Sequence, residues 1–145
     1  MIIIFGGTTE GRIAVKVLDE AGSPYYYSTR GNAQQVECRH GIRMTGGMDC
    51  NAMLEFCTTH DIRLIIDAAH PFASLLHSTV ASVSEQLDIP VIRLERRYPP
   101  RDESLVWCDS FDDAIDYLES HEIRDLLALS GVQTITKLQR YWEKH

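Results

Sequence analysis

The stretch GGTTEGR, at residues 6–12, combines residue types that could bind a phosphate group. An apolar run precedes Gly6 and Gly7, and two glycines allow a tight turn and a close approach of a ligand to the backbone. A predicted helix follows at once, and the free N–H groups of its first turn attract anions. The glycine spacing, G-G-x-x-x-G, is a variant of the dinucleotide fingerprint, and a glycine-rich turn without a ligand is the alternative. The predicted cofactor-binding residues of this turn are Gly6, Gly7, Thr8, Thr9, Glu10, Gly11 and Arg12.

A second candidate site is STRG, at residues 28–31, after the next predicted strand. A site that prefers NAD would carry Asp or Glu here to hold the ribose 2′-hydroxyl. Ser28, Thr29 and Arg30 instead offer two hydroxyls and a guanidinium, which suit a 2′-phosphate. The sequence therefore predicts NADPH as the cofactor, held here by these three residues. The alternative is that Arg30 is one more solvated surface arginine.

A third candidate site is DAAHPFA, at residues 67–73, which also follows a strand pattern. Asp67 ends that pattern, and Pro71 disfavours a helical backbone at His70. His70 could donate a hydrogen bond or a proton to a ligand. Loops at strand ends often carry function, so this cluster predicts a site. A helix-capping turn with a satisfied histidine is the alternative.

Four arginines crowd the stretch RLERRYPPR, at residues 93–101, in an otherwise acidic chain. They are Arg93, Arg96, Arg97 and Arg101. Such a loop suits a polyanionic substrate, and a solvated basic loop explains the same composition equally well.

Alternating strand and helix patterns would position these motifs. Strands are predicted at 1–5, 24–29, 42–44, 63–69, 91–95, 105–110 and 125–131, and helices at 10–21, 49–60, 73–87, 110–120 and 134–143. Asp49 and Ser110 are predicted to cap two of the helices. This alternation predicts an α/β fold, a Rossmann-like parallel sheet with helices on both faces. Ligands of such sheets bind beyond the carboxyl ends of the strands, where the candidate motifs lie.

Composition excludes several other classes of protein. The formal net charge of −7 argues against a nucleic-acid-binding surface. No apolar run approaches the ~20 residues that span a bilayer, and the N-terminus resembles no signal peptide. The four cysteines show no disulfide framework, so we expect reduced thiols in a cytoplasmic protein. Cys and His lack the repeated spacing of a zinc finger, so no metal site is predicted.

Four motifs in this order resemble the precorrin-6A reductases of cobalamin biosynthesis, including the cobalt-precorrin-6A form. They are GGTTEGR at 6–12, DAAHPFA at 67–73, RLER at 93–96 and LSGVQTI at 129–135. The family usually has threonine where this chain has Ala69. The motifs are spread over most of the length of the chain, from residue 6 to residue 135. Their joint occurrence is far more specific than any one of them.

The resemblance implies an enzyme that transfers hydride from NADPH to a ring-contracted tetrapyrrole with many carboxylates. It implies His70 and Asp67 as catalytic residues beside the nicotinamide. It further implies substrate-binding residues near the macrocycle and its acetate and propionate groups, namely Pro71, Phe72, Arg93, Arg96 and Arg97.

Members of that family have two Rossmann-like lobes with the active site between them. We therefore expect residues 1–124 to form the first lobe and residues 125–145 to form the first strand and helix of a truncated second lobe. Such a truncated lobe would expose apolar surface and could promote self-association.

Two other functions fit the same residues. One is a different NADP-dependent reductase of the Rossmann type, although the Tyr-x-x-x-Lys motif of short-chain dehydrogenases is absent from the sequence. The other is a nucleotide-binding module that is inactive in its truncated form.

Overall fold

The computed structural model describes residues 1–32, 34–97, 100–132 and 134–145. It divides the chain into two compact units, Met1–Arg97 and Tyr98–His145. The lobe boundary expected at 124/125 refers to a two-lobed enzyme and stays a prediction. Residues 98–99 of the arginine-rich stretch and residue 133 of the fourth motif lie outside the described residues.

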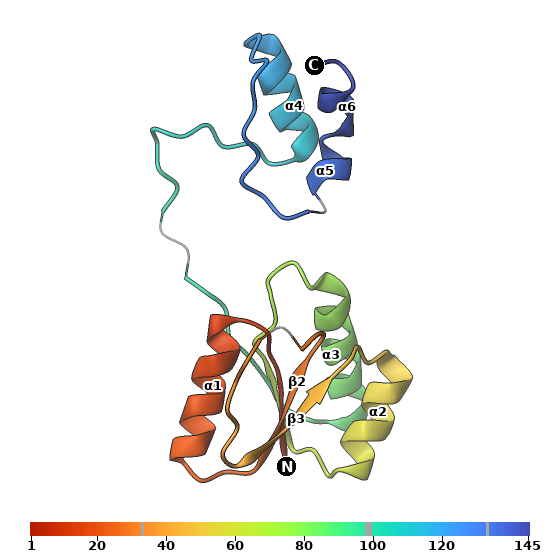
Figure 1. Ribbon diagram of the computed structural model, residues 1–145. Coiled ribbons are helices and arrows are strands. Elements are labelled where there is room, and N and C mark those ends of the chain that lie inside the picture. The colour runs from red at the N-terminus through yellow and green to blue at the C-terminus, as the bar shows by residue number, and fades with distance from the viewer. Residues whose placement is uncertain (33, 98–99, 133) are drawn as a thin grey trace. The chain divides into compact units, whose positions relative to one another are not determined.

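A five-stranded parallel sheet forms the centre of the first unit, with the strand order β3-β2-β1-β4-β5 (Figure 1). The strands are β1 (Ile2–Phe5), β2 (Tyr25–Thr29), β3 (Gly41–Thr45), β4 (Leu64–Asp67) and β5 (Val91–Arg93). The helices of this unit are α1 (Thr9–Glu20), α2 (Cys50–Thr59) and α3 (Ser74–Leu87). The strand order reverses between β1 and β4, which is where such folds bind ligands. The predicted Rossmann-like α/β fold is confirmed.

The two faces of the sheet bury alternate side chains of the central strand β1. Ile3 and Phe5 belong to one apolar cluster, which includes Met53 of α2 and Val80 of α3. Ile4 belongs to the other cluster, which includes residues of α1. Figure 1 shows α1 on one face of the sheet and α2 and α3 on the other. This alternation follows from the two-residue period of a strand and fixes the positions of the helix N-termini.

Helix starts follow the capping residues that the sequence contains. Asp49 accepts a hydrogen bond from the Ala52 amide at the start of α2. Ser110 accepts one from the Asp113 amide at the start of α4 (Phe111–Ser120). Both caps were predicted from the sequence, and both are confirmed. Each satisfies a first-turn N–H that has no partner within its helix.

The second unit is helical, and two strand predictions are wrong there. It contains α4, α5 (Thr134–Lys137) and α6 (Gln139–Trp142). Its small core is formed by Ile115, Leu138 and Tyr141. Residues 105–110 and 125–131, all of which the structure describes, form no strand. A strand needs a neighbour to satisfy its backbone groups, and an apolar pattern alone does not provide one.

Candidate functional site

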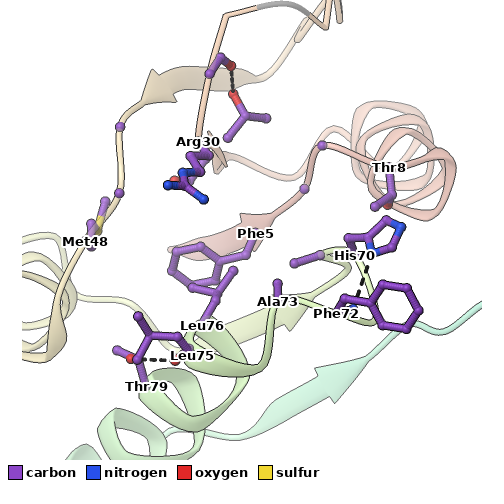
Figure 2. A pocket seen from close by; sticks show the side chains of 18 of the residues that line it. Phe5, Thr8, Arg30, Met48, His70, Phe72, Ala73, Leu75, Leu76 and Thr79 are labelled. Carbon is purple, nitrogen blue, oxygen red and sulfur yellow. Dashed lines mark hydrogen bonds between the residues drawn. The ribbon is translucent and has the colours of Figure 1, made fainter. Parts of the chain in front are cut away.

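A cavity of about 840 Å³ opens at the carboxyl edge of the sheet in the first unit. Segments that follow β1, β2, β3 and β4 line it, together with the first two turns of α3. Figure 2 shows Arg30 coming from the end of β2, His70 and Phe72 from the loop before α3, and Leu76 from α3 itself. The cavity therefore brings together three motifs that are far apart in the sequence.

The turn between β1 and α1 contributes Gly6, Gly7 and Thr8 to the lining of the cavity. Gly7 has a positive φ of 97°, and a Cβ there would meet no atom within 4 Å. A Cβ on Gly6 would lie 2.3 Å from the ring of Tyr27, so this position has no room for a side chain. The two adjacent glycines are thus required for different reasons. Packing against Tyr27 requires Gly6, and the backbone conformation beside the cavity requires Gly7.

Tyr27 and Gln34 hold this turn in place through hydrogen bonds. The Tyr27 hydroxyl accepts a hydrogen bond from the Gly7 amide at 3.1 Å and donates one to Oε1 of Gln34 at 2.6 Å. The side-chain amide of Gln34 donates to the Thr8 carbonyl at 3.2 Å. Burial raises the pKa of Tyr27, so its hydroxyl keeps the proton that it donates. Neither residue was predicted from the sequence as part of a site, because neither belongs to a recognisable motif.

Thr8 links the turn to the loop after β4. Its hydroxyl donates to the Ala68 carbonyl at 2.6 Å and accepts from the Gly11 amide at 3.0 Å. Thr8 is thereby the N-cap of α1, whose N-terminus lies at the cavity. The amides of this first turn are the groups that could bind an anion.

The remaining residues of the first motif do not line the cavity. They are Thr9, Glu10, Gly11 and Arg12. Glu10 forms an ion pair with Arg96 at 3.1 Å, and this hydrogen bond lowers the pKa of Glu10. Gly11 is buried, and a Cβ there would lie 2.9 Å from the Cα of Gly6. Gly11 therefore allows the close packing of α1 on the turn.

The end of β2 presents one long cationic side chain to the cavity. Ser28 and Thr29 line the cavity but are buried, and the Thr29 hydroxyl donates to the Gly31 carbonyl at 2.8 Å. Arg30 is exposed and lines the cavity, and within the described residues it has no ion-pair or hydrogen-bond partner. Arg30 is therefore the residue of this motif that is available to an anionic group.

The loop after β4 places His70 and Phe72 at the cavity, whereas Pro71 does not line it. The Phe72 amide donates to Nδ1 of His70 at 3.2 Å, so the proton of a neutral ring is on Nε2. The Phe72 side chain is 87% exposed. The loop thus presents a hydrogen-bond donor and an apolar ring to the cavity.

Asp67 does not reach the cavity. It is only 2% exposed, and its carboxylate contacts His77 and Arg93. Arg93 is held there by Asp67 and also by Glu95, at 2.9 Å. Neither Arg96, which pairs with Glu10, nor Arg97, which is exposed, lines the cavity. The arginines predicted to bind substrate therefore do not form one basic patch in this unit.

Sequence analysis also missed the cavity residues after β3 and on α3. Gly46, Gly47 and Met48 follow β3, and Leu75 and Thr79 come from α3. The sequence contains a signal for the first group, since Gly46 and Gly47 lie close to the end of the strand predicted at 42–44, and Gly46 has a positive φ of 118° in the structure. Nothing in the local sequence distinguishes the α3 residues from ordinary helix surface.

The described part of the chain offers neither a metal site nor a membrane-spanning helix. It contains no group of three or more His, Cys, Asp or Glu side chains that could hold a metal ion. None of its helices is both long enough and apolar enough to cross a membrane.

Comparisons with known proteins agree on one family. The model of the family described as precorrin-6x reductase CbiJ/CobK matches residues 1–145. The precorrin-6A reductase of Rhodococcus erythropolis is 29% identical over 148 residues, which cover 97% of this chain and 59% of that protein. The cobalt-precorrin-6A reductase of Synechocystis sp. is 38% identical over 100 residues, which cover 67% of this chain and 38% of that protein.

A solved structure of CobK precorrin-6A reductase has a TM-score of 0.66 and 24% sequence identity, and the match covers 79% of this chain and 46% of that chain. At this identity the likeness supports the fold alone. The chain thus spans between about two fifths and three fifths of the length of these relatives.

Proposed function

We propose a function for this chain, which belongs to the precorrin-6x reductase CbiJ/CobK family. The family model matches residues 1–145. We infer that its first unit binds NADPH for the reduction of a ring-contracted tetrapyrrole, precorrin-6A or cobalt-precorrin-6A, in cobalamin biosynthesis. The observation that carries the proposal is the cavity itself, which joins the N-terminus of α1 and Arg30 at the reversal of strand order.

The residues of the cavity fit a dinucleotide phosphate. Its volume of about 840 Å³ lies in the range of small-molecule sites, roughly 300–1,000 Å³. Gly7 leaves open space above the backbone, and the first-turn amides of α1 would hold the pyrophosphate. Arg30 would hold the 2′-phosphate through charge-assisted hydrogen bonds. Thr9 and Glu10 would offer their backbone amides to the pyrophosphate. The amides of Gly11 and Arg12 bond to Thr8 and would support the turn.

The chain's own residues would then position the substrate beside the cofactor. When bound, NADPH supplies the hydride, and the protein contributes binding and orientation. His70 would donate a hydrogen bond from Nε2 to the macrocycle or to the nicotinamide. The exposed ring of Phe72 would cover a flat apolar face of the tetrapyrrole.

The carboxylates of the substrate need cationic partners elsewhere on the surface. Arg97 is exposed. Arg96 forms an ion pair with Glu10 in the first turn of α1, which follows the carboxyl end of β1. We propose these two arginines for the acetate and propionate groups. Arg93 forms an ion pair with buried Asp67. We therefore propose that both residues position the loop, and that neither binds the substrate nor takes part in the reaction.

The test is the cofactor preference of Arg30→Ala, measured by titration of NADPH and NADH. Loss of the bonds to a phosphate should cost on the order of 1.5–3 kcal/mol, so NADPH should bind at least tenfold more weakly. NADH affinity should stay within about twofold of its starting value. Arg63→Ala is the matched control, because Arg63 is exposed at the start of β4 and pairs with Asp61. Equal weakening of both nucleotides by Arg30→Ala would contradict the assignment.

A further inference from the structure

A partly buried polar cluster supports the loop that carries His70, and none of its members lines the cavity. The Asp67 cluster consists of Asp67, His77 and Arg93. Oδ2 of Asp67 lies 2.8 Å from Nδ1 of His77 and 2.6 Å from Nη1 of Arg93. Arg93 Nη1 also contacts His77 Nδ1. The three side chains come from β4, α3 and β5, so the cluster joins three elements around the loop.

His77 connects this cluster to the loop through its second ring nitrogen. Nε2 of His77 lies 3.0 Å from the carbonyl oxygen of His70. A carbonyl oxygen can only accept, so Nε2 carries a proton and donates it. The same carbonyl accepts the Ala73 amide at 2.8 Å, and Oδ1 of Asp67 accepts the Ala69 amide at 3.2 Å. The Asp67 cluster therefore holds the loop at two adjacent residues, Ala69 and His70.

We propose that His77 is a positioning residue, which fixes the carbonyl of His70 and thereby aims the His70 ring at the cavity. Asp67 and Arg93 orient the His77 ring from its other edge. Ion pairs contribute little stability when they are exposed and lose solvation when they are buried, so stability alone does not account for this partly buried cluster. We attribute the cluster instead to the specific geometry that it gives the loop. The proposal rests on the proposed function only in giving His70 a ligand to face.

Two substitutions separate the two edges of the ring. His77→Gln can place an amide donor near the position of Nε2, whereas His77→Asn places one near the position of Nδ1. Glutamine should therefore keep the bond to the His70 carbonyl, and asparagine should lose it. Both variants remove the ring, so each is the control for the other.

The measurement is amide hydrogen exchange at Phe72 and Ala73, which bond to the ring and the carbonyl of His70 respectively. His77→Asn should speed exchange there about tenfold, as expected when one hydrogen bond is lost. His77→Gln should stay within about threefold of the unaltered chain. Val83, buried on α3, should exchange at the same rate in all three proteins. Equal acceleration in both variants, or none in either, would overturn the proposal.

A second measurement needs no variant and so does not depend on folding of the substituted chains. A nitrogen-edited NMR spectrum of the unaltered chain should show a slowly exchanging proton on Nε2 of His77. If the proton is absent from that nitrogen, the bond to the His70 carbonyl does not exist and the proposal fails. A chain that binds no NADPH would instead refute the proposed function and leave both of these results interpretable.

In an active reductase the same pair of variants has a kinetic consequence. His77→Asn should lower kcat for tetrapyrrole reduction about tenfold and leave KM for NADPH within about twofold, because the cofactor turn is not part of the loop. His77→Gln should retain most of kcat. A loss of kcat that is equal in the two variants would show that His77 acts only on stability.

Discussion

The two units of this chain use apolar residues in different ways. In Met1–Arg97, alternate residues of each central strand are buried on opposite faces, and two apolar clusters result. In Tyr98–His145, three residues form the core, and Leu127 and Leu129 are 81% and 89% exposed. Both regions contain runs of residues with high strand propensity. Those runs form strands in the first unit, where β1 has a neighbour on each side.

Whether a segment forms a strand therefore depends on a second segment that pairs with it. β4 is buried because β1 and β5 complete its ladders and α3 covers it. The segment 125–131 is also rich in apolar residues, but no described segment pairs with it. The cavity of the first unit depends on the same condition, because paired strands bring distant loops to one edge. Four predictions test this comparison.

The largest effect is expected for Ile65→Ala in the centre of β4. Ile65 is fully buried, and removing its side chain should lower the free energy of unfolding by about 2–5 kcal/mol. Urea unfolding followed by circular dichroism measures the change. Ile65→Val is the matched control and should cost about 0.5–1.5 kcal/mol. A loss below about 1 kcal/mol for Ile65→Ala would contradict the burial of β4 between β1 and β5.

A smaller loss of stability is expected for Gly6→Ala. The new methyl group would overlap the Tyr27 ring, and overpacking of this kind costs typically 1–3 kcal/mol. Gly31→Ala is the control, because a Cβ at Gly31 meets no atom within 4 Å. Thermal unfolding of both variants is the measurement. Equal melting temperatures would contradict the close packing of the turn on β2.

A pH-dependent effect of modest size is expected from the ion pair between Glu10 and Arg96. The folded pKa of Glu10 is lowered, so its contribution to stability is complete above the ordinary value near 4.5 and is lost as the pH falls through the lowered value. The unaltered chain should therefore be more stable than Glu10→Gln at pH 7, and the difference should shrink toward pH 3. Urea midpoints at both pH values measure it. A difference that does not change with pH would contradict this pairing.

The smallest effect is expected in the second unit. Leu127→Ser and Leu129→Ser should each change the free energy of unfolding by less than about 0.5 kcal/mol, because both side chains are exposed. Urea unfolding again gives the value. A loss above about 2 kcal/mol would mean that this segment is buried as a strand, as its sequence pattern predicts, and the contrast between the two units would disappear.

The fold of the first unit could be predicted because each signal is local and the signals agree. β-branched runs at 2–5 and 63–67, helix caps such as Asp49, and glycines after strands all point to one architecture. The strands expected at 105–110 and 125–131 failed because pairing depends on segments that are distant in the sequence. The helix expected at 134–143 is two short helices that meet at Leu138.

The candidate site was predicted in outline only. Motif positions located Gly7, Arg30 and His70 at the cavity, since strand ends of a parallel sheet converge. The sequence could not show that Asp67 and Arg93 pair away from the cavity, because that depends on the direction of side chains from adjacent strands. Nor could it distinguish the two glycines, since the ring that excludes a side chain at residue 6 comes from another strand.

We propose that the turn after β1 and the end of β2 hold two phosphate groups of one cofactor, the pyrophosphate and the 2′-phosphate. A crystal structure of the chain with NADP⁺ tests it most directly. We expect the pyrophosphate against the first-turn amides of α1, beside Gly7, and the 2′-phosphate within hydrogen-bond distance of the Arg30 guanidinium. NADP⁺ bound with its 2′-phosphate away from Arg30, or a cavity that stays empty at saturating NADP⁺, would contradict it.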